Sequence, residues 1–398
     1  MQKKLIALAI AGLASSAAFA DSNVTIYGRI DTGFVSRGGS DGDAHFKGTK
    51  TEMASGVQSG SRLGFKGVED LGNGLKAIWQ LENSVVNDSN AGGAAGTFGR
   101  NIRNAYLGLT GSFGTAVAGR LDGVRYGVYN KYDAFAGGGI GNFTQMTLQV
   151  DRADNAIAYI SPTWSGFTLV LAHARDTTGN EANGALNYTG APFAAGSARA
   201  NTGDGLLYTI ETNYTNGPIS ADIGYETVRY KNHNNAAQGG LLDKEVVYYI
   251  AGSYDFGFLK LRALWDHHRA EGSKNYTGLG AQFDDVANYN AWFVSATVPY
   301  GNFLFKATYG RVNDKLNNTE AGLVRSLIEG GDASKWGIGV NYNLSKRTNV
   351  YLDYGHISNS GDATHAISYL ANSASTTNGL IGNGYGVRGW NIGMAHNF

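Results

Sequence analysis

One stretch of the chain, residues 62–83, constrains the fold most, because two alternating runs flank a strong turn signal. The stretch reads RLGFKGVEDLGNGLKAIWQLEN, and the Gly and Asn cluster at 70–74 is typical of a tight reversal between two strands. Before this turn, Arg62 and Lys66 share one face and Phe65 points the other way. A period of 2 predicts β-strands and argues against helices.

The same alternation continues after the turn. Lys76, Gln80 and Glu82 lie on one face, and Leu75 and Trp79 lie on the other. A strand with charge on one face and hydrocarbon on the other fits a half-buried strand of a soluble protein. It fits the wall of a membrane barrel equally well, so the rest of the chain must distinguish the two.

Short turns and long polar connections alternate along the whole chain. The short turns lie at residues 70–74, 111–114, 162–166, 215–218, 254–258, 299–302 and 343–347. The long connections lie at residues 36–59, 84–102, 121–149, 175–204, 231–243, 267–288, 312–334 and 357–384. This asymmetry predicts a transmembrane barrel with short periplasmic turns and long external loops. Seven turns join 14 strands and the first and last runs add two, so we expect 16 antiparallel strands without an open edge.

The composition supports an exported membrane barrel. The chain contains no cysteine, so an exported protein of this length needs a large closed architecture in place of disulfides. Its mean hydropathy is −0.23, and after the N-terminus no apolar run approaches the roughly 20 residues of a membrane helix. Lysine and arginine balance aspartate and glutamate at 32 each, which argues against nucleic acid as a partner.

The two ends of the chain carry targeting signals. Residues 1–20 have a basic start, an apolar centre and an Ala-Phe-Ala finish, which predicts a signal peptide cleaved before Asp21. Without it the net charge is 30 − 32 = −2. We expect residues 21–398 to form one barrel domain. The last run alternates and stops on Phe398, which is similar to the assembly signal of outer-membrane barrels, although an edge strand of a soluble sandwich is the alternative.

Five motifs lie along the barrel pattern. They are YGRIDTG at 27–33, GSRLGFKGVEDLGNGLKAIWQLE at 60–82, AYLGLTGSFGTAVAGR at 105–120, DNAIAYISP at 154–162 and the closing GMAHNF. Together these motifs resemble the general diffusion porins of Gram-negative bacteria, especially the betaproteobacterial and neisserial branch. The resemblance implies a homotrimer in the outer membrane, in contact with its lipids and inserted by the barrel assembly machinery. It also implies passive diffusion of small hydrophilic solutes and ions, through a lumen that the third external loop narrows.

In such porins basic residues on the first strands line the constriction. The resemblance assigns this role to Arg29, Arg62, Arg103 and Arg120, and the alternation independently turns Arg29 and Arg62 away from the apolar face. For Arg103 the two arguments disagree, because period 2 places it in phase with Leu107, which we expect to face lipid. An arginine facing lipid at mid-bilayer costs about 2 to 4 kcal/mol, so we expect Arg103 in the lumen.

The acidic side of the constriction is expected to combine wall and loop residues. These are Asp31 and Glu82 on the wall, with Asp122 and Asp133 in the third loop. If the loop folds inward, its acids would face the arginines across water and create a transverse field, whereas otherwise they are ordinary solvated loop charges. Ala158 stands where some relatives carry arginine, which weakens the case for a strong anion preference.

Two other functions remain open. In a substrate-selective channel on the same fold, the loop residues Tyr126, Tyr129 and Tyr132 would form a slide for sugars or aromatic acids. A barrel enzyme or adhesin would need a cluster of serine, histidine and acid that the spacing does not supply. The adjacent His267 and His268 are expected in a loop, where such a pair is more often solvated than metal-bound. The sequence therefore predicts no catalytic residue, metal site or cofactor.

Overall fold

The computed structural model describes residues 23–39, 48–88, 102–147, 149–175, 187–189, 205–230, 242–272, 285–316, 331–360, 363, 365, 367 and 386–398. The expected signal peptide at 1–20 lies outside these residues. Within them, no helix has the length and apolar character needed to cross a membrane.

Nearly all the regular structure is β-strand. In chain order the strands are β1 (Asn23–Gly38), β2 (Thr49–Ser55), β3 (Arg62–Gly72), β4 (Leu75–Ser84), β5 (Ile102–Gly111), β6 (Gly114–Asp122), β7 (Gln149–Ile160), β8 (Phe167–Arg175), β9 (Asn187–Thr189), β10 (Gly205–Asn216), β11 (Ile219–Tyr230), β12 (Leu242–Asp255), β13 (Lys260–Gly272), β14 (Asp285–Tyr300), β15 (Phe303–Asp314), β16 (Ala333–Asn343), β17 (Thr348–Asn359) and β18 (Arg388–Asn397). Between β6 and β7 lie the helix α2 (Val124–Tyr132) and the short 3₁₀ helix η2 (Thr144–Met146).

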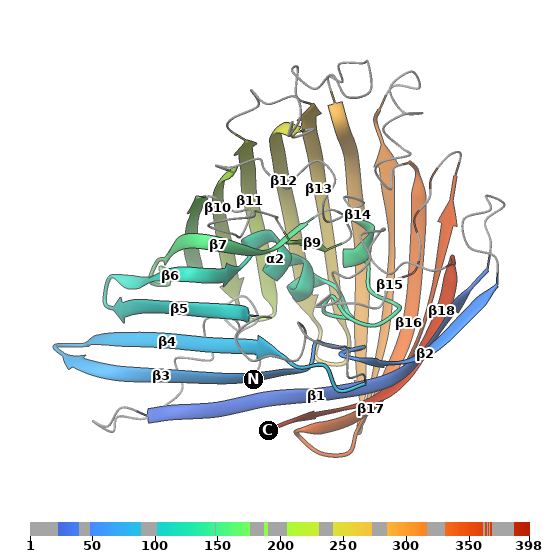
Figure 1. The fold of residues 1–398 in the computed structure, drawn as a ribbon, viewed down its shortest axis with the longest axis horizontal. Helices are drawn as coiled ribbons and strands as arrows, with labels where there is room; N and C mark the ends of the chain where they lie inside the picture. The colour runs from blue at the N-terminus through green and yellow to red at the C-terminus, as the bar shows by residue number, and fades with distance from the viewer. Residues whose placement is uncertain are drawn as a thin grey trace.

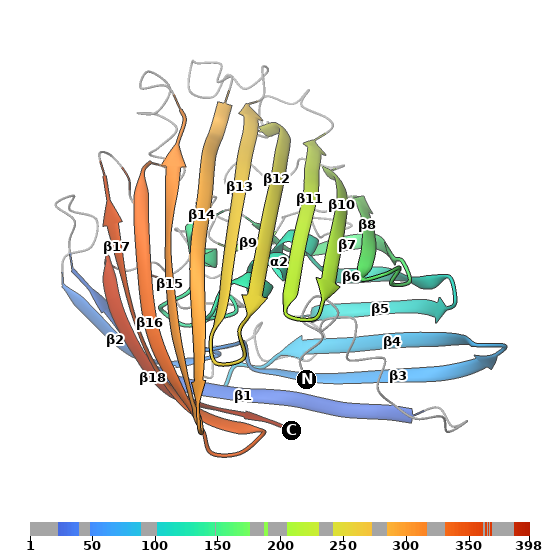
Figure 2. The ribbon, with the colours of Figure 1, turned by 180° about the vertical axis from the view of Figure 1, so that it is seen from behind.

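The strands form a closed antiparallel barrel with 16 strand positions, as predicted (Figures 1 and 2). Two pairs of labelled strands share one position each. β3 pairs with the first part of β1 and β2 with the last part, so together they make the second barrel strand. Likewise β8 and the short β9 pair with opposite ends of β7.

Backbone hydrogen bonds between β1 and β18 close the barrel. The register pairs Arg29 with Asn397 and runs to Gly38 with Arg388. At the chain end, the Gly28 N–H donates to the Phe398 carbonyl oxygen at 3.0 Å, and the Phe398 N–H donates back at 3.1 Å. Hydrocarbon offers no replacement for these bonds, so a spanning sheet must pair both of its edges in this way.

The alternation is reversed relative to a soluble protein. Large apolar side chains point outward and remain exposed, for example Ile26 at 62 %, Leu107 at 64 % and Ile223 at 59 %. The opposite face of the strands carries buried polar and charged side chains, including Asp31 and Asp266 at 0 %. This pattern fits a wall between lipid and a polar lumen.

All seven short turns lie where the sequence predicts them, but several predicted loops contain strand residues, most of all those at 36–59 and 267–288. In the stretch 36–59, β1 extends to Gly38 and residues 49–55 pair with it as β2. In the stretch 267–288, β13 continues to Gly272, so His267 and His268 lie in a strand and not in a loop. Polar composition misled the prediction, since strands whose inner face meets water also contain many polar residues.

We expect Gly28→Ala to impair barrel closure. A Cβ at Gly28 would meet the ring of Phe398 and lie 2.7 Å from the carbonyl oxygen of Arg62. Overpacking of this kind costs about 1 to 3 kcal/mol. The folded fraction, measured by heat-modifiable mobility after refolding in detergent, should fall. Gly252→Ala is the matched control, because its Cβ would meet only the Ser220 carbonyl oxygen at 3.8 Å. Equal folded fractions for the two variants would contradict this role of Gly28.

Candidate functional site: the lumen and its third loop

The described residues of the third loop, 121–147 and 149, lie inside the barrel. Its helix α2 contacts β7, β11, β12 and β13, and both views place the helix within the strands (Figures 1 and 2). The buried side of α2 carries Arg125, Tyr126, Val128, Tyr129 and Tyr132. Burying an arginine and three tyrosines is costly unless their polar groups find partners. Those partners must lie on the barrel wall, because the local sequence does not supply them.

Buried ion pairs attach the helix to acids on the inner wall. The Arg125 guanidinium lies 3.0 Å from Asp266 and 3.6 Å from Glu226, and the Lys131 ammonium lies 2.6 Å from Asp222. Burial alone would lower the pKa of Arg125, but the two acids outweigh it and raise the pKa above its ordinary value. Arg125 therefore stays charged, and removing one partner from such a pair is strongly destabilising.

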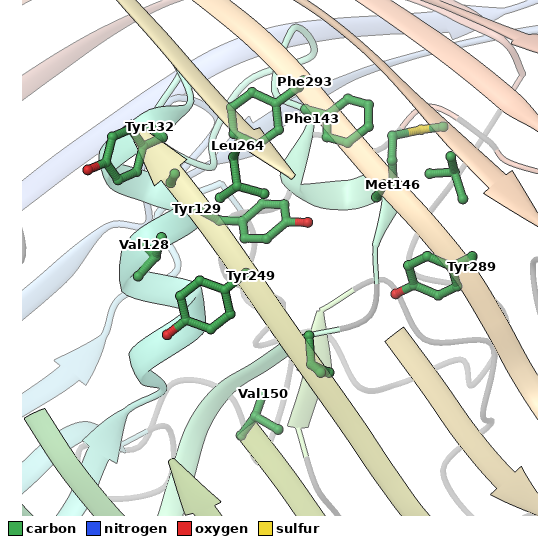
Figure 3. Close-up of a cluster of buried hydrophobic side chains, with 14 of the residues drawn as sticks. Val128, Tyr129, Tyr132, Phe143, Met146, Val150, Tyr249, Leu264, Tyr289 and Phe293 are labelled. Atoms are coloured by element: carbon green, nitrogen blue, oxygen red, sulfur yellow. The ribbon is translucent and has the colours of Figure 1, made fainter. Parts of the chain in front are cut away.

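The loop tyrosines point at the wall and do not line the channel. Tyr129 donates to Asp266 at 2.6 Å, and Tyr132 donates to Asp222. Both side chains are fully buried, and Figure 3 shows them among aromatic and aliphatic side chains, with the ring centroids of Tyr129 and Phe293 5.6 Å apart. Tyr126 is only 7 % exposed. The slide expected from a substrate-selective channel is therefore not formed by these residues.

The tip of the loop rests on the opposite part of the wall. The Gly139 N–H donates to the Val57 carbonyl oxygen at 2.7 Å, and the Ile140 N–H donates to the Asn391 side chain at 2.7 Å. A Cβ at Gly355 in β17 would lie 2.6 Å from the Ile140 carbonyl oxygen. At Gly337 in β16 a Cβ would meet the loop backbone directly. Glycines in the wall thus let the loop backbone lie flat against it.

Asp133 has a different place from the one predicted. Its carboxylate accepts hydrogen bonds from the Phe135 N–H at 2.9 Å, the Phe143 N–H at 2.6 Å and the Thr308 hydroxyl at 3.1 Å. The side chain is 3 % exposed, and burial raises its pKa, although the backbone donors and Lys335 act in the opposite direction. It holds the loop together against β15 and β16, so the expectation that it faces the arginines across water is wrong.

Arg29 and Arg62 lie directly opposite each other on β1 and β3. Arg29 donates to Gln58 at 2.6 Å and lies 3.4 Å from Asp31. Arg62 donates to the Ser59 hydroxyl at 3.4 Å, and in the described part of the chain no acidic side chain lies within ion-pair distance of it. Like charges directly opposite on a sheet are destabilising, which favours a functional reason for the pair.

Asp31 is a structural centre of the wall. One carboxylate oxygen accepts from the Gln58 and Ser59 N–H groups at 3.1 and 2.8 Å, and the other accepts from the Tyr351 hydroxyl at 2.6 Å. Asp31 therefore holds residues 56–61, the segment between β2 and β3. In this segment, the Val57 carbonyl oxygen accepts the hydrogen bond from Gly139 at the tip of the third loop.

A β-bulge resolves the disagreement over Arg103. Leu81 pairs with Ala105 and Asn83 pairs with Ile102, so β5 has one extra residue between these two positions. The phase changes there, Ile102 is exposed, and Arg103 is buried on the same face as Glu82. Strict period 2 failed at this position because a bulge shifts every following side chain by one.

Glu82 sits between Arg103 and Tyr27. It accepts from Arg103 Nε at 2.5 Å and from the Tyr27 hydroxyl at 2.9 Å. Gln80 donates to the Tyr27 hydroxyl at 2.7 Å, and Tyr106 donates to Gln80 at 3.0 Å. The charge of Arg103 is thus paired within the wall, in contrast to that of Arg62.

The remaining predicted site residues lie near the start of the third loop. Asp122 accepts from Asn104 at 3.1 Å and lies 3.0 Å from Arg152. Arg120 lies apart from the Arg29 and Arg62 pair, because its guanidinium binds Asp154 and its Nε donates to the Ile102 carbonyl oxygen at 2.9 Å. Phe398 lies at the closing seam described above.

The sequence reasoning missed the acids that hold α2. Asp222, Glu226 and Asp266 bind α2 from the inner face of β11 and β13, and Glu211 and Glu245 lie on the same inner face of the neighbouring strands; all five are almost fully buried. Their alternation with outward apolar residues could have revealed their common face. No group of side chains in the described ranges could hold a metal ion.

We expect Asp133→Ala to loosen the third loop. The change removes the carboxylate that accepts all three hydrogen bonds, so the Phe135 and Phe143 N–H groups are left unpaired. Each orphaned buried donor costs about 1 to 3 kcal/mol. Amide hydrogen exchange over residues 134–147 should accelerate, and the open-channel current should become noisier. Thr308→Ala removes one of the three bonds and should have a smaller effect. Unchanged exchange in Asp133→Ala would contradict this role.

Comparison with known proteins agrees with this architecture. The family model of Gram-negative porins matches residues 7–362. An outer membrane porin protein of Bordetella pertussis is 30 % identical, covering 89 % of this chain and 94 % of the relative. Outer membrane porin protein 32 of Delftia acidovorans is 30 % identical over 92 % of both chains.

Solved structures give the same answer. The anion-selective porin from Comamonas acidovorans superposes with a TM-score of 0.70 at 25 % identity, covering 95 % of this chain and 100 % of that one. OmpT of Vibrio cholerae in its trimer form has a TM-score of 0.63 at 15 % identity, covering 95 % and 99 %. With a family match over most of its length and a 16-strand barrel around a loop-lined lumen, the chain belongs to the Gram-negative porins, channels of the outer membrane.

Proposed function

We propose that this porin is a trimeric diffusion channel whose constriction favours small anions. The observation that carries the proposal is the pair of Arg29 and Arg62, placed opposite each other on the inner wall. Fixed charge in a narrow aqueous passage with low-dielectric walls biases the local ion population strongly. The pair therefore acts on every ion that passes the third loop.

Asp31 pairs with Arg29, but the acids on the inner face of β11 and β13 do not cancel this charge. Asp222, Glu226 and Asp266 lie behind α2, where they are paired with Arg125 and Lys131. The more exposed side of α2 carries Gly127 and Asn130, and neither is acidic. The loop acids therefore do not create the expected transverse field. The passage instead has basic groups on one side and no acid on the side of α2.

The comparison with the Comamonas acidovorans porin supports the same sign, since that protein is described as anion-selective. Ala158 faces the lumen without a charge, so the preference should rest on Arg29 and Arg62 and be moderate. Arg103 is neutralised by Glu82 and contributes less. The substrate-selective alternative loses its support with the burial of Tyr126, Tyr129 and Tyr132. Relatives that are channels also support a role other than catalysis.

The double change Arg29→Ser and Arg62→Ser should shift the reversal potential under a salt gradient toward the value for cations. The shift should be larger at low salt, since the Debye length falls from about 30 Å at 0.01 M to about 3 Å at 1 M. Planar-bilayer recordings at both ionic strengths measure it.

The matched control removes two basic groups outside the lumen, with Lys346→Ser and Arg347→Ser in the exposed turn between β16 and β17. This variant should retain the wild-type reversal potential. If the two double variants behave alike at low salt, Arg29 and Arg62 do not control the ion preference.

Trimer formation is expected through the outward faces near the closing seam. There Ile26 on β1, Leu107 on β5 and Ile392 on β18 are exposed in the single chain. Ile26→Asn should weaken the trimer. Ile223 on β11 has a similar exposed fraction, 59 % against 62 % for Ile26, but we expect it to face lipid, so Ile223→Asn should leave the trimer intact. Native mass measurement in mild detergent distinguishes the two, and a monomeric wild type would reject the assembly.

A further inference from the structure

An open apolar groove of about 370 Å³ lies on the outer face of β7, β8, β10 and β11. The strand order places these strands about halfway round the barrel from the closing seam, away from the surface through which we expect the trimer to form. We call this space the wall groove. Six of the side chains that line it are large and apolar or aromatic: Ile157, Tyr159, Leu171, Tyr208, Ile210 and Tyr225.

His173 adds a polar ring to this lining. Its Nδ1 donates to the Leu207 carbonyl oxygen at 2.9 Å, because a carbonyl oxygen can only accept. The ring also stacks on Tyr208, with ring centroids 4.5 Å apart. These two contacts fix the imidazole, and neither of them uses Nε2. The groove can therefore hold a polar head beside His173 as well as a hydrocarbon chain.

A row of basic side chains crosses the outer face of the sheet next to the wall groove. Leu206 on β10 pairs with Arg175 on one side and with Arg229 on the other, and Arg229 pairs with Lys244. Period 2, counted from the exposed apolar residues of the same strands, places all four side chains on the outer face. Arg175 and Arg229 are exposed and Lys244 is partly exposed. We call these three cations the basic row.

The basic row lies toward the external surface. It is two residues beyond His173 and Tyr208 along β8 and β10, a rise of about 7 Å. These strand ends are opposite the short turns, which we expect on the periplasmic side (Figure 2). From β8 to β12 the row crosses three strand spacings of about 4.8 Å, so it is about 14 Å long. Hydrocarbon and basic groups therefore adjoin at the level of the outer-leaflet head groups.

The acids of the described residues leave the charge of the row largely intact. Glu271 pairs in register with Lys244, but its carboxylate lies 3.7 Å from Arg269. Among the described residues, no acidic side chain lies within ion-pair distance of Arg175 or Arg229. Exposed guanidinium groups beside an apolar groove are complementary to an amphipathic anion.

We propose that the wall groove and the basic row bind a diphosphorylated, acylated glycolipid of the outer leaflet, of the lipid A type. One acyl chain lies in the wall groove, and the phosphates contact the basic row through charge-assisted hydrogen bonds. A row about 14 Å long suits a head group with two phosphates, whereas a phospholipid such as phosphatidylglycerol carries one. The site lies on the lipid side of the wall, so it goes beyond the proposed function of the lumen.

Native mass spectrometry in mild detergent tests the proposal on the wild-type protein alone. The probes are lipid A with two phosphates, lipid A with one phosphate and phosphatidylglycerol, each titrated at the same ionic strength. The concentration for half-saturation should be lowest for the diphosphorylated probe. It should be about tenfold or more higher for phosphatidylglycerol, as expected from losing a charge-assisted contact. Equal values for the three probes, or the lowest value for phosphatidylglycerol, would overturn the assignment.

The double change Arg175→Ser and Arg229→Ser locates the phosphates. It should raise the half-saturation concentration of diphosphorylated lipid A by about tenfold or more. The matched control is Arg311→Ser and Lys315→Ser, which removes two exposed cations at the external end of β15 and should keep the wild-type value. If the two double variants bind this probe alike, the basic row is not the phosphate site.

A change in the wall groove tests the acyl chain separately. Ile210→Ala removes part of the groove lining and should weaken binding of diphosphorylated lipid A by about threefold or more, because less hydrocarbon is buried. Ile250→Ala on β12 is the matched control, since Ile250 lies outside the groove lining and has a similar exposed fraction, 54 % against 48 % for Ile210. Equal binding by these two variants would mean that no chain occupies the wall groove and would overturn the proposal.

Discussion

The pairing of every backbone polar group is the constraint from which the rest of this structure follows. Hydrocarbon cannot replace a lost hydrogen bond, so the sheet must close, and it does so where Gly28 and Phe398 exchange two bonds. Closure turns one face of each strand to lipid and the other to a lumen. The chain can then keep many charges at membrane depth, because they face each other and water rather than lipid.

The third loop converts this open lumen into a constriction, and buried ion pairs hold it there. Arg125 and Lys131 bind acids of β11 and β13, while Asp133 ties the loop backbone to itself and to β15. A charge that is paired in these contacts no longer acts on ions in the passage. The arginines that remain least neutralised, Arg62 above all, lie on the opposite wall, so the attachment of the loop and the ion preference of the channel have a common origin.

Local patterns predicted much of this fold, because period 2 and turn residues act over a few positions. They located the seven short turns and the 16 strands, and with the family resemblance they indicated a porin. The site was less predictable, since its contacts join distant residues. The hydrogen bond from Thr308 to Asp133 spans 175 positions, and no local pattern announces it. The bulge before Ala105, which turns Arg103 inward, shows in the sequence only as one charged residue in phase with Leu107.

Basic charge on the β1 and β3 wall, least compensated at Arg62, faces the helix α2, which carries no acid. Anomalous diffraction from crystals soaked in rubidium bromide locates both ions in one experiment. We expect bromide beside Arg29 and Arg62 and no rubidium between these residues and the more exposed side of α2 at Asn130. Rubidium bound in that passage, with no bromide at the two arginines, would contradict it.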